Sequence, residues 1–125
     1  MKAWFVPKGT RLETLRAARE LAAYPDEQLE RLLPYFDEVS LPAGSVVARR
    51  SDQCSEFVVV MRGRLTATEP HARARTLTAG DTLGWQAMWE REPNSATVVV
   101  EADARLLVMS HAQFRAIKAV AKPSN

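Results

Sequence analysis

The chain contains one cysteine and two histidines, and this scarcity excludes several kinds of site. Cys54 has no partner for an intrachain disulfide and lacks the paired spacing of a zinc site. His71 and His111 have no carboxylate or cysteine at ligand spacing. No serine has the elbow motif of a hydrolase nucleophile. We therefore expect no metal site, no catalytic residue and no enzymatic activity, and the lone cysteine favours a reducing cytoplasm.

Long apolar runs and a strong net charge are also absent. The longest runs, such as Phe57 to Met61 and Ala96 to Val100, are far shorter than the roughly 20 residues that cross a bilayer. Met1 to Pro7 contains no signal-peptide core. A net charge of +2 is too small to demand a nucleic acid or an anionic membrane as partner. We expect a cytoplasmic protein without a membrane span.

The sequence does contain the mixture of residues typical of one compact domain. It has 125 residues, 46% of them hydrophobic and 26% charged. Apolar residues recur at helical spacing from Leu12 to Tyr24, which predicts an amphipathic helix. Pro25 favours the start of a second helix, which Pro34 should end near Leu33. Before these helices, Trp4, Phe5 and Val6 show no pattern, and they fold back on the domain or enter another subunit.

After Phe36 the apolar spacing changes from about 3.6 to 2, as in strands. Short apolar segments separated by glycine or proline predict about eight strands in an antiparallel jelly-roll barrel. A final helix should begin after Ser110, because Gln113 completes a capping box and Phe114, Ile117 and Val120 form a stripe. The most evident strand segments are Val39 with Leu41, Val46 to Ala48, Phe57 to Met61, Leu65 to Thr68, Arg75 to Leu77, Thr97 to Val100 and Leu106 to Met109. The expected fold is mainly β with flanking helices.

The region from Gly84 to Ala96 interrupts this strand pattern. It contains helix formers and two tryptophans, followed by a turn at Arg91-Glu92-Pro93-Asn94. A short helix inserted between strands of a jelly roll often carries the functional site. We therefore expect the site in this region.

Several motifs then occur in a recognisable order. They are Ala43-Gly44-Ser45-Val46-Val47, the segment from Phe57 to Leu65 around Gly63, and Ala79-Gly80-Asp81-Thr82-Leu83-Gly84. Together they resemble the cyclic nucleotide-binding domain of the catabolite activator protein, kinase regulatory subunits and nucleotide-gated channels. The resemblance covers residues 25–118, which we take as the domain, with an N-terminal segment and helix at 1–24 and a tail at 119–125.

The resemblance places the family's phosphate-binding cassette at Gly84 to Thr97, with two departures. The family's glutamate, which accepts a hydrogen bond from the ribose, is Trp85 here, and the arginine that pairs with the phosphate is Asn94. Ser51 also stands where many members have a glycine, with Arg50 in place of an acidic residue. The predicted ligand-binding residues are Gly84, Trp85, Gln86, Ala87, Met88, Asn94, Ser95, Ala96 and Thr97.

The two departures predict weak binding of cyclic AMP. Asn94 offers neither the charge nor the planar fork of a guanidinium. Losing both family contacts costs roughly 4 to 7 kcal/mol, which turns a micromolar ligand into a millimolar one. We therefore expect a stand-alone regulatory module that has lost cyclic AMP binding, uses no cofactor and contacts another protein or a second copy. The alternative is a sensor that holds a cyclic nucleotide or another anion through the amides of 86–88 and the hydroxyls of Ser95 and Thr97.

Three further features bear on partners. Trp85 and Trp89 lie four residues apart and would form an aromatic contact surface, although core packing is the simpler interpretation for Trp89. Arginines at positions 49, 50, 62, 64, 73 and 75 lack interleaved aromatics, so we interpret them as solvated rather than as a nucleic-acid surface. Because only eleven residues follow Phe114, we expect no DNA-binding domain.

Overall fold

The computed structural model describes residues 8–118, and its first elements are helical. Helix α1 spans Lys8–Ala17, and a 3-10 turn, η1, spans Arg19–Leu21. The single helix predicted from Leu12 to Tyr24 is therefore wrong in extent. Ala18 is extended, with φ −70° and ψ 126°, and this residue separates the two pieces. The break lets both Leu15 and Leu21 reach the core, where each is almost fully buried.

The second helical segment agrees with the sequence prediction. Helix α2 (Asp26–Leu32) follows Pro25 and has Asp26 and Glu27 in its first turn, where carboxylates complement the helix dipole. It gives way to a 3-10 turn, η2 (Leu33–Tyr35), that contains Pro34. Proline lacks the amide that an α-helical interior requires, so the helix ends at the predicted place.

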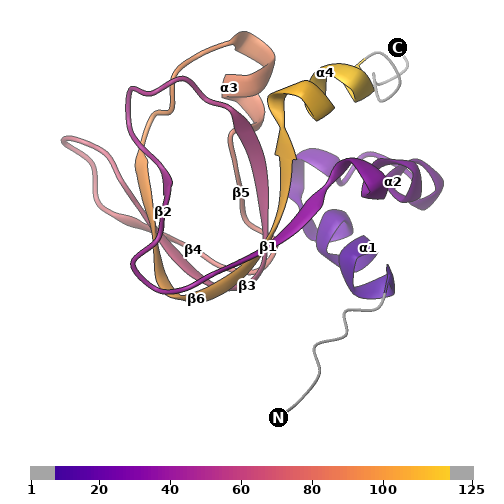
Figure 1. Ribbon diagram of the computed structural model, residues 1–125, viewed down its shortest axis with the longest axis horizontal. Helices are drawn as coiled ribbons and strands as arrows, with labels where there is room; N and C mark the ends of the chain where they lie inside the picture. The colour runs from indigo at the N-terminus through magenta and orange to yellow at the C-terminus, as the bar shows by residue number, and fades with distance from the viewer. Residues whose placement is uncertain (1–7, 119–125) are drawn as a thin grey trace.

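The remainder is an antiparallel sheet that curls into a roll (Figure 1). The order of hydrogen-bonded strands is β1-β6-β3-β4, while β2 pairs with β6 and β5 pairs with β3. Among the described residues β1 and β4 do not pair with each other, so the roll is not closed. The strands are β1 (Asp37–Leu41), β2 (Val46–Ala48), β3 (Glu56–Thr68), β4 (Arg75–Leu77), β5 (Thr82–Leu83) and β6 (Thr97–Ser110). This confirms the mainly β jelly-roll class.

The strand count within residues 8–118 is six rather than about eight, because β3 and β6 each contain two of the predicted segments. Gly63 lies inside β3 with φ +97°, and the β3–β6 register shifts between Val60 and Leu65. Such a bulge bends a strand without ending it. A Cβ on Gly63 would lie 2.5 Å from the Asp103 carbonyl oxygen, so the close approach of the two strands requires glycine.

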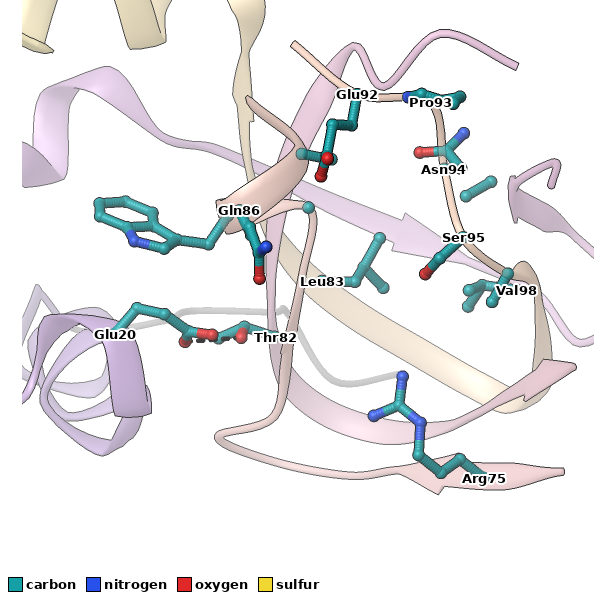
Figure 2. Close-up of a pocket in the computed structure, with 15 residues that line it drawn as sticks. Glu20, Arg75, Thr82, Leu83, Gln86, Glu92, Pro93, Asn94, Ser95 and Val98 are labelled. Carbon is teal, nitrogen blue, oxygen red and sulfur yellow. Dashed lines mark hydrogen bonds between the residues drawn. The ribbon is translucent and has the colours of Figure 1, made fainter. Parts of the chain in front are cut away.

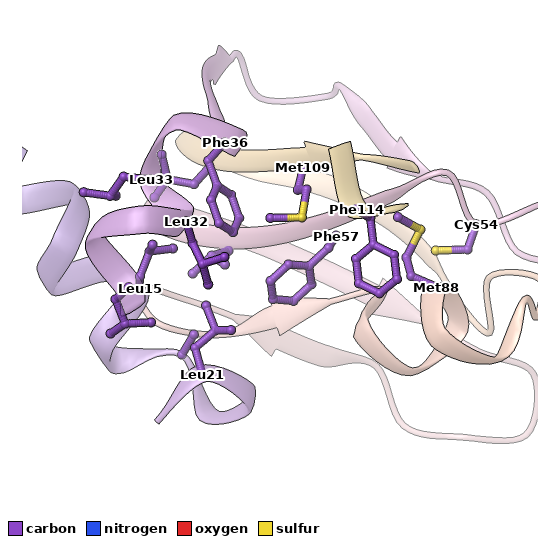
Figure 3. Close-up of a cluster of buried hydrophobic side chains, with 14 residues drawn as sticks. Leu15, Leu21, Leu32, Leu33, Phe36, Cys54, Phe57, Met88, Met109 and Phe114 are labelled. Atoms are coloured by element: carbon purple, nitrogen blue, oxygen red, sulfur yellow. The ribbon is translucent and has the colours of Figure 1, made fainter. Parts of the chain in front are cut away.

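Strands β3 and β6 separate two apolar clusters because their side chains alternate between faces. Phe57 and Val59 face the first cluster, whereas Val58 and Val60 face the second. The helical-side cluster also contains buried residues from the helices, among them Leu15, Leu29, Met88 and Phe114 (Figure 3). The barrel-side cluster lies inside the roll and contains Leu65, Ala67, Leu77, Ala96, Val98, Val100, Ala104, Leu106 and Val108.

Helix α4 (His111–Lys118) closes the helical side. The predicted capping box is confirmed: the Ser110 amide donates to Gln113 Oε1 at 2.8 Å, and the Gln113 amide donates to Ser110 Oγ at 3.2 Å. This start directs Phe114 into the helical-side cluster, where it is 1% exposed. Val120, the predicted tail at 119–125 and the segment Trp4-Phe5-Val6 lie outside the described residues.

An ionic contact holds α1 against the sheet. Glu38 on β1 accepts a hydrogen bond from Arg105 Nη1 at 2.8 Å, and its other oxygen lies 3.1 Å from Arg11 Nε on α1. The Glu38 and Arg105 side chains are 18% and 14% exposed, so the pair is largely shielded from solvent. Within residues 8–118 no helix has the length and apolar character needed to span a bilayer.

Candidate functional site

A cavity of about 350 Å³ opens on the barrel side of the molecule (Figure 2). It is bounded by helix α3 (Trp85–Glu90), by β4 and β5, and by the segment that leads into β6. Of the nine residues predicted from the cassette, seven line it, and Met88 and Thr97 do not. The cavity therefore lies at the predicted cassette segment and includes further residues on its wall, and the binding role of the predicted residues stays a prediction.

Gly84 sets the direction of α3. Its φ is +93°, and a Cβ would lie 2.2 Å from the Glu56 carbonyl oxygen. Only glycine combines this left-handed conformation with so close an approach to backbone. The Gly84 carbonyl then accepts a hydrogen bond from the Met88 amide at 2.9 Å. The Met88 amide, which we predicted to hold an anion, is consequently used inside the helix.

Asn94 connects the cassette to the turn after β2 through hydrogen bonds. Its side-chain Nδ2 donates to the Arg49 carbonyl at 3.0 Å, while its backbone amide donates to the Asp52 carbonyl at 2.8 Å. Ser51, whose φ is +75°, donates its amide to the Asn94 carbonyl at 2.9 Å. Ser51 therefore adopts the left-handed conformation that glycine adopts most easily. Asn94 lines the cavity, and one of the two N–H donors of its side chain is already used by the Arg49 carbonyl.

Thr97 also forms a hydrogen bond with the turn after β2. Its hydroxyl oxygen accepts a hydrogen bond from the Arg50 amide at 3.0 Å, and Thr97 does not line the cavity. Ser95 is exposed and lines the cavity, and Ala96 is buried behind it. Gln86 is exposed and donates to Glu90 at 3.3 Å along α3. Among the predicted hydroxyls, only that of Ser95 faces the cavity.

Trp85 contacts both the cavity and the helical-side cluster. It lines the cavity, and it also packs edge-on against Phe57, with ring centroids 4.9 Å apart. Phe114 on α4 lies 5.8 Å from Trp85 and 5.1 Å from Trp89, again edge to face. Such pairs add about 0.5 to 1.5 kcal/mol beyond apolar burial. Trp89 packs against the core, as its simpler interpretation predicted, and an interfacial role for Trp85 stays a prediction.

Sequence reasoning missed the charged groups on the wall. The cavity is lined by Arg75 from β4, Glu20 from η1 and Glu92, which follows α3. The Glu20 carboxylate accepts a hydrogen bond from the Thr82 hydroxyl at 2.7 Å. A signal for Arg75 was present, because it lies two residues before buried Leu77 on a strand and so shares its inward face. No local pattern marked Glu20.

Comparison with known proteins agrees with this geometry. Residues 38–119 match the family described as the cyclic nucleotide-binding domain. The chain belongs to the cyclic nucleotide-binding domain family. The resemblance stated from the motifs is thereby confirmed. Across residues 8–118 no cluster of histidine, cysteine and carboxylate side chains is suited to hold a metal ion.

The similar proteins are larger than this cyclic nucleotide-binding domain. The Pycsar effector protein XpPycTIR of Xanthomonas perforans is 28% identical over 107 residues, which are 85% of this chain and 35% of the relative. The chain thus spans about a third of the length of that curated relative. The sequence comparison supports family membership.

Solved structures show the same fold. A putative cyclic nucleotide binding protein from Ruegeria pomeroyi superimposes with a TM-score of 0.78 at 12% identity, over 92% of this chain and 53% of that one. The regulatory domain of Toxoplasma gondii PKA with cAMP gives 0.77 at 20% identity, over 92% and 47%. The N-terminal domain of a transcriptional regulator from Streptomyces coelicolor gives 0.72 at 25% identity, over 86% and 79%.

Proposed function

We propose that this chain is a cytoplasmic regulatory domain that binds a small anionic ligand in the cassette cavity. Ligand binding then alters the helical face, which is formed by α1, α2 and α4. The observation that carries the proposal is the double position of Trp85, which forms part of the cavity wall and packs on the aromatic residues under α4. A ligand that moves this ring changes the packing of the helices. Trp85 therefore couples ligand binding in the cavity to the packing of the helices.

The size of the cavity supports a small-molecule ligand. Its volume of about 350 Å³ lies at the lower end of the range of about 300 to 1,000 Å³ that small-molecule sites occupy. Trp85 forms part of the wall and leaves this space open, although it replaces a much smaller family glutamate. The volume suits a compact ligand.

The output of the domain is a contact with another protein or with a second copy of the chain. The helices α1, α2 and α4 lie beside the roll in Figure 1, and α1 and α4 pack against β3. The relative from Xanthomonas perforans is named an effector protein. By analogy with that name, we infer a signalling role.

Calorimetric titration and thermal unfolding with cyclic AMP, cyclic GMP, cyclic CMP and cyclic UMP test the proposal. We expect at least one of them to bind with a submillimolar Kd and to raise Tm, since a ligand that binds only the folded state stabilises it. Ser95→Trp places an indole at the mouth of the cavity and should abolish binding. Thr76→Trp, on the neighbouring outward position of β4, is the matched control and should bind as the wild type does.

A ligand-free interaction module is the second candidate function. It is favoured by the commitment of the Asn94 side chain to the Arg49 carbonyl and by the replacement of the ribose-binding glutamate with Trp85. This candidate predicts no heat and no change in Tm with any of the four nucleotides at millimolar concentration. Such a result would reject ligand sensing and leave protein contact as the function.

A further inference from the structure

We infer that Arg75 and Glu20 hold the ligand in place of the cassette arginine and glutamate: Arg75 pairs with its phosphate, and Glu20 accepts a hydrogen bond from its hydroxyl. The inference rests on the proposed function, because it assigns the contacts of the ligand in the same cavity. Neither residue belongs to the cassette segment 84–97. Glu20 comes from η1 near the start of the chain, and Arg75 comes from β4, the strand that precedes β5.

Arg75 is suited to pair with the phosphate. It lies on β4 opposite Ala67 of β3, and it shares the inward face of β4 with buried Leu77. In Figure 2 its guanidinium points from β4 towards the space beside Leu83 and Ser95. Its side chain forms no ion pair or hydrogen bond with any other residue in the described range 8–118. A guanidinium presents a planar fork of donors that matches two phosphate oxygens.

Glu20 is suited to accept a ligand hydroxyl. One oxygen of its carboxylate, Oε1, accepts from Thr82 Oγ1 at 2.7 Å, which fixes the side chain at the cavity edge (Figure 2). The other oxygen, Oε2, forms no hydrogen bond within residues 8–118. No cation in that range pairs with the carboxylate. A carboxylate oriented in this way accepts hydrogen bonds only, so its natural partner is a hydroxyl or amide donor.

The charges on the wall select the class of anion. The lining contains one guanidinium, Arg75, and two carboxylates, Glu20 and Glu92. A phosphate monoester carries close to two negative charges at neutral pH, and its second charge would be repelled by these carboxylates. A cyclic phosphate diester carries a single charge, which Arg75 alone balances. The wall therefore favours the cyclic diester over the corresponding 5′-monophosphate.

Calorimetry on the full chain tests the assignment, with the four cyclic nucleotides as probes. Arg75→Gln removes the charge and should weaken Kd roughly tenfold or more, because a charge-assisted contact is worth a little over 1.4 kcal/mol. Arg73→Gln, an exposed arginine that does not line the cavity, is the matched control and should leave Kd within about twofold. Urea unfolding of both variants should match the wild type, since both side chains are exposed.

The role of Glu20 has a separate test. Glu20→Gln should weaken binding of the cyclic ribonucleotide several-fold, and it should have little effect on the 2′-deoxy analogue, which lacks the hydroxyl. The wild type should bind the cyclic nucleotide roughly tenfold tighter than the 5′-monophosphate of the same base. Equal losses for the ribose and deoxyribose ligands would overturn the assigned contact of Glu20, and equal affinity for the monophosphate would overturn the selection that we assign to the charges of the wall.

The remaining outcomes distinguish a wrong assignment of Arg75 from a failure of the proposed function. If the wild type binds a cyclic nucleotide and Arg75→Gln binds it equally well, the assignment of Arg75 is overturned while ligand sensing stands. If the wild type binds none of the four nucleotides at millimolar concentration, the proposed function is overturned, and this inference with it. A tenfold loss confined to Arg75→Gln, with Arg73→Gln unchanged, supports both.

Discussion

The helical-side and barrel-side clusters share two strands yet differ in the size of their side chains. Phe57 and Phe114 dominate the first, and Trp85 and Trp89 pack against it. Valine, alanine and leucine alone make up the second. Ala96 and Val98 of this second cluster line the cavity. Large interlocking rings fill the helical side, whereas the small side chains within the roll leave room for a ligand.

The largest effect should come from breaking the aromatic cluster. Phe57→Ala removes a fully buried ring that contacts both Phe36 and Trp85, and we expect it to lower the free energy of unfolding by about 3 to 5 kcal/mol. Val58→Ala, the next residue on the opposite face, removes only two methyl groups and should cost about 1.5 to 2 kcal/mol. Urea unfolding of both variants measures the difference, and equal losses would contradict the contrast between the clusters.

Gly84 lies between Leu83, which packs against the barrel-side cluster, and Trp85, which packs against the helical-side cluster. Its substitution should have the next largest effect. Gly84→Ala combines a left-handed backbone with a Cβ placed 2.2 Å from the Glu56 carbonyl oxygen. We expect a loss of about 3 kcal/mol, from backbone strain and overpacking together. Gly44→Ala is the matched control, because Gly44 has the same φ of +93° but no atom within 4 Å of its Cβ position. It should lose only about 1 to 2 kcal/mol in the same urea titration.

The ionic contact at Glu38 allows the attachment of the helical layer to be weakened without altering either cluster. Glu38→Gln removes the charge that faces Arg105 and Arg11, and we expect a loss of about 1.5 to 3 kcal/mol. Glu101→Gln breaks an ion pair with Arg64 at the surface, where both side chains are 48% exposed. The free energy of unfolding of that control should stay nearly unchanged. Similar losses in the two variants would show that burial does not strengthen the Glu38 contact.

The smallest effect should be a dependence on pH through Cys54 in the helical-side cluster. Burial raises the pKa of the Cys54 thiol above its ordinary value. As the pH rises through that ordinary value, the unfolded chain loses its proton first, so stability should fall slightly in alkaline buffer. Cys54→Ala should remove this part of the pH dependence. Thiol labelling should be slow in the native protein and fast in urea, and rapid native labelling would show that the cluster opens easily.

The sequence predicted the helical and strand segments because their signals are local. The proline at 34, the capping pair Ser110 and Gln113 and the alternation after Phe36 each act within a few residues, and the structure confirms them. Two of the predicted strand segments join into the single strand β3, because a bulge at Gly63 looks like a turn when the partner strand is unknown. Likewise β5 is only two residues long, and pairing with β3 defines it.

The sequence by itself determined the family, the order of the elements and the position of the cassette, because glycines, prolines and apolar spacing act through neighbouring backbone. Only the tertiary structure decided which charges reach the cavity. Strand alternation with Leu77 sets the face on which Arg75 lies, but only the pairing of β4 with β3 brings that face to the cavity. Glu20 reaches the cavity because η1 lies beside β5, where Thr82 donates to its carboxylate. Asn94 and Thr97 are occupied because the turn at 49–52 folds over them. A cavity wall is assembled from distant segments, so its chemistry depends on packing that no local pattern specifies.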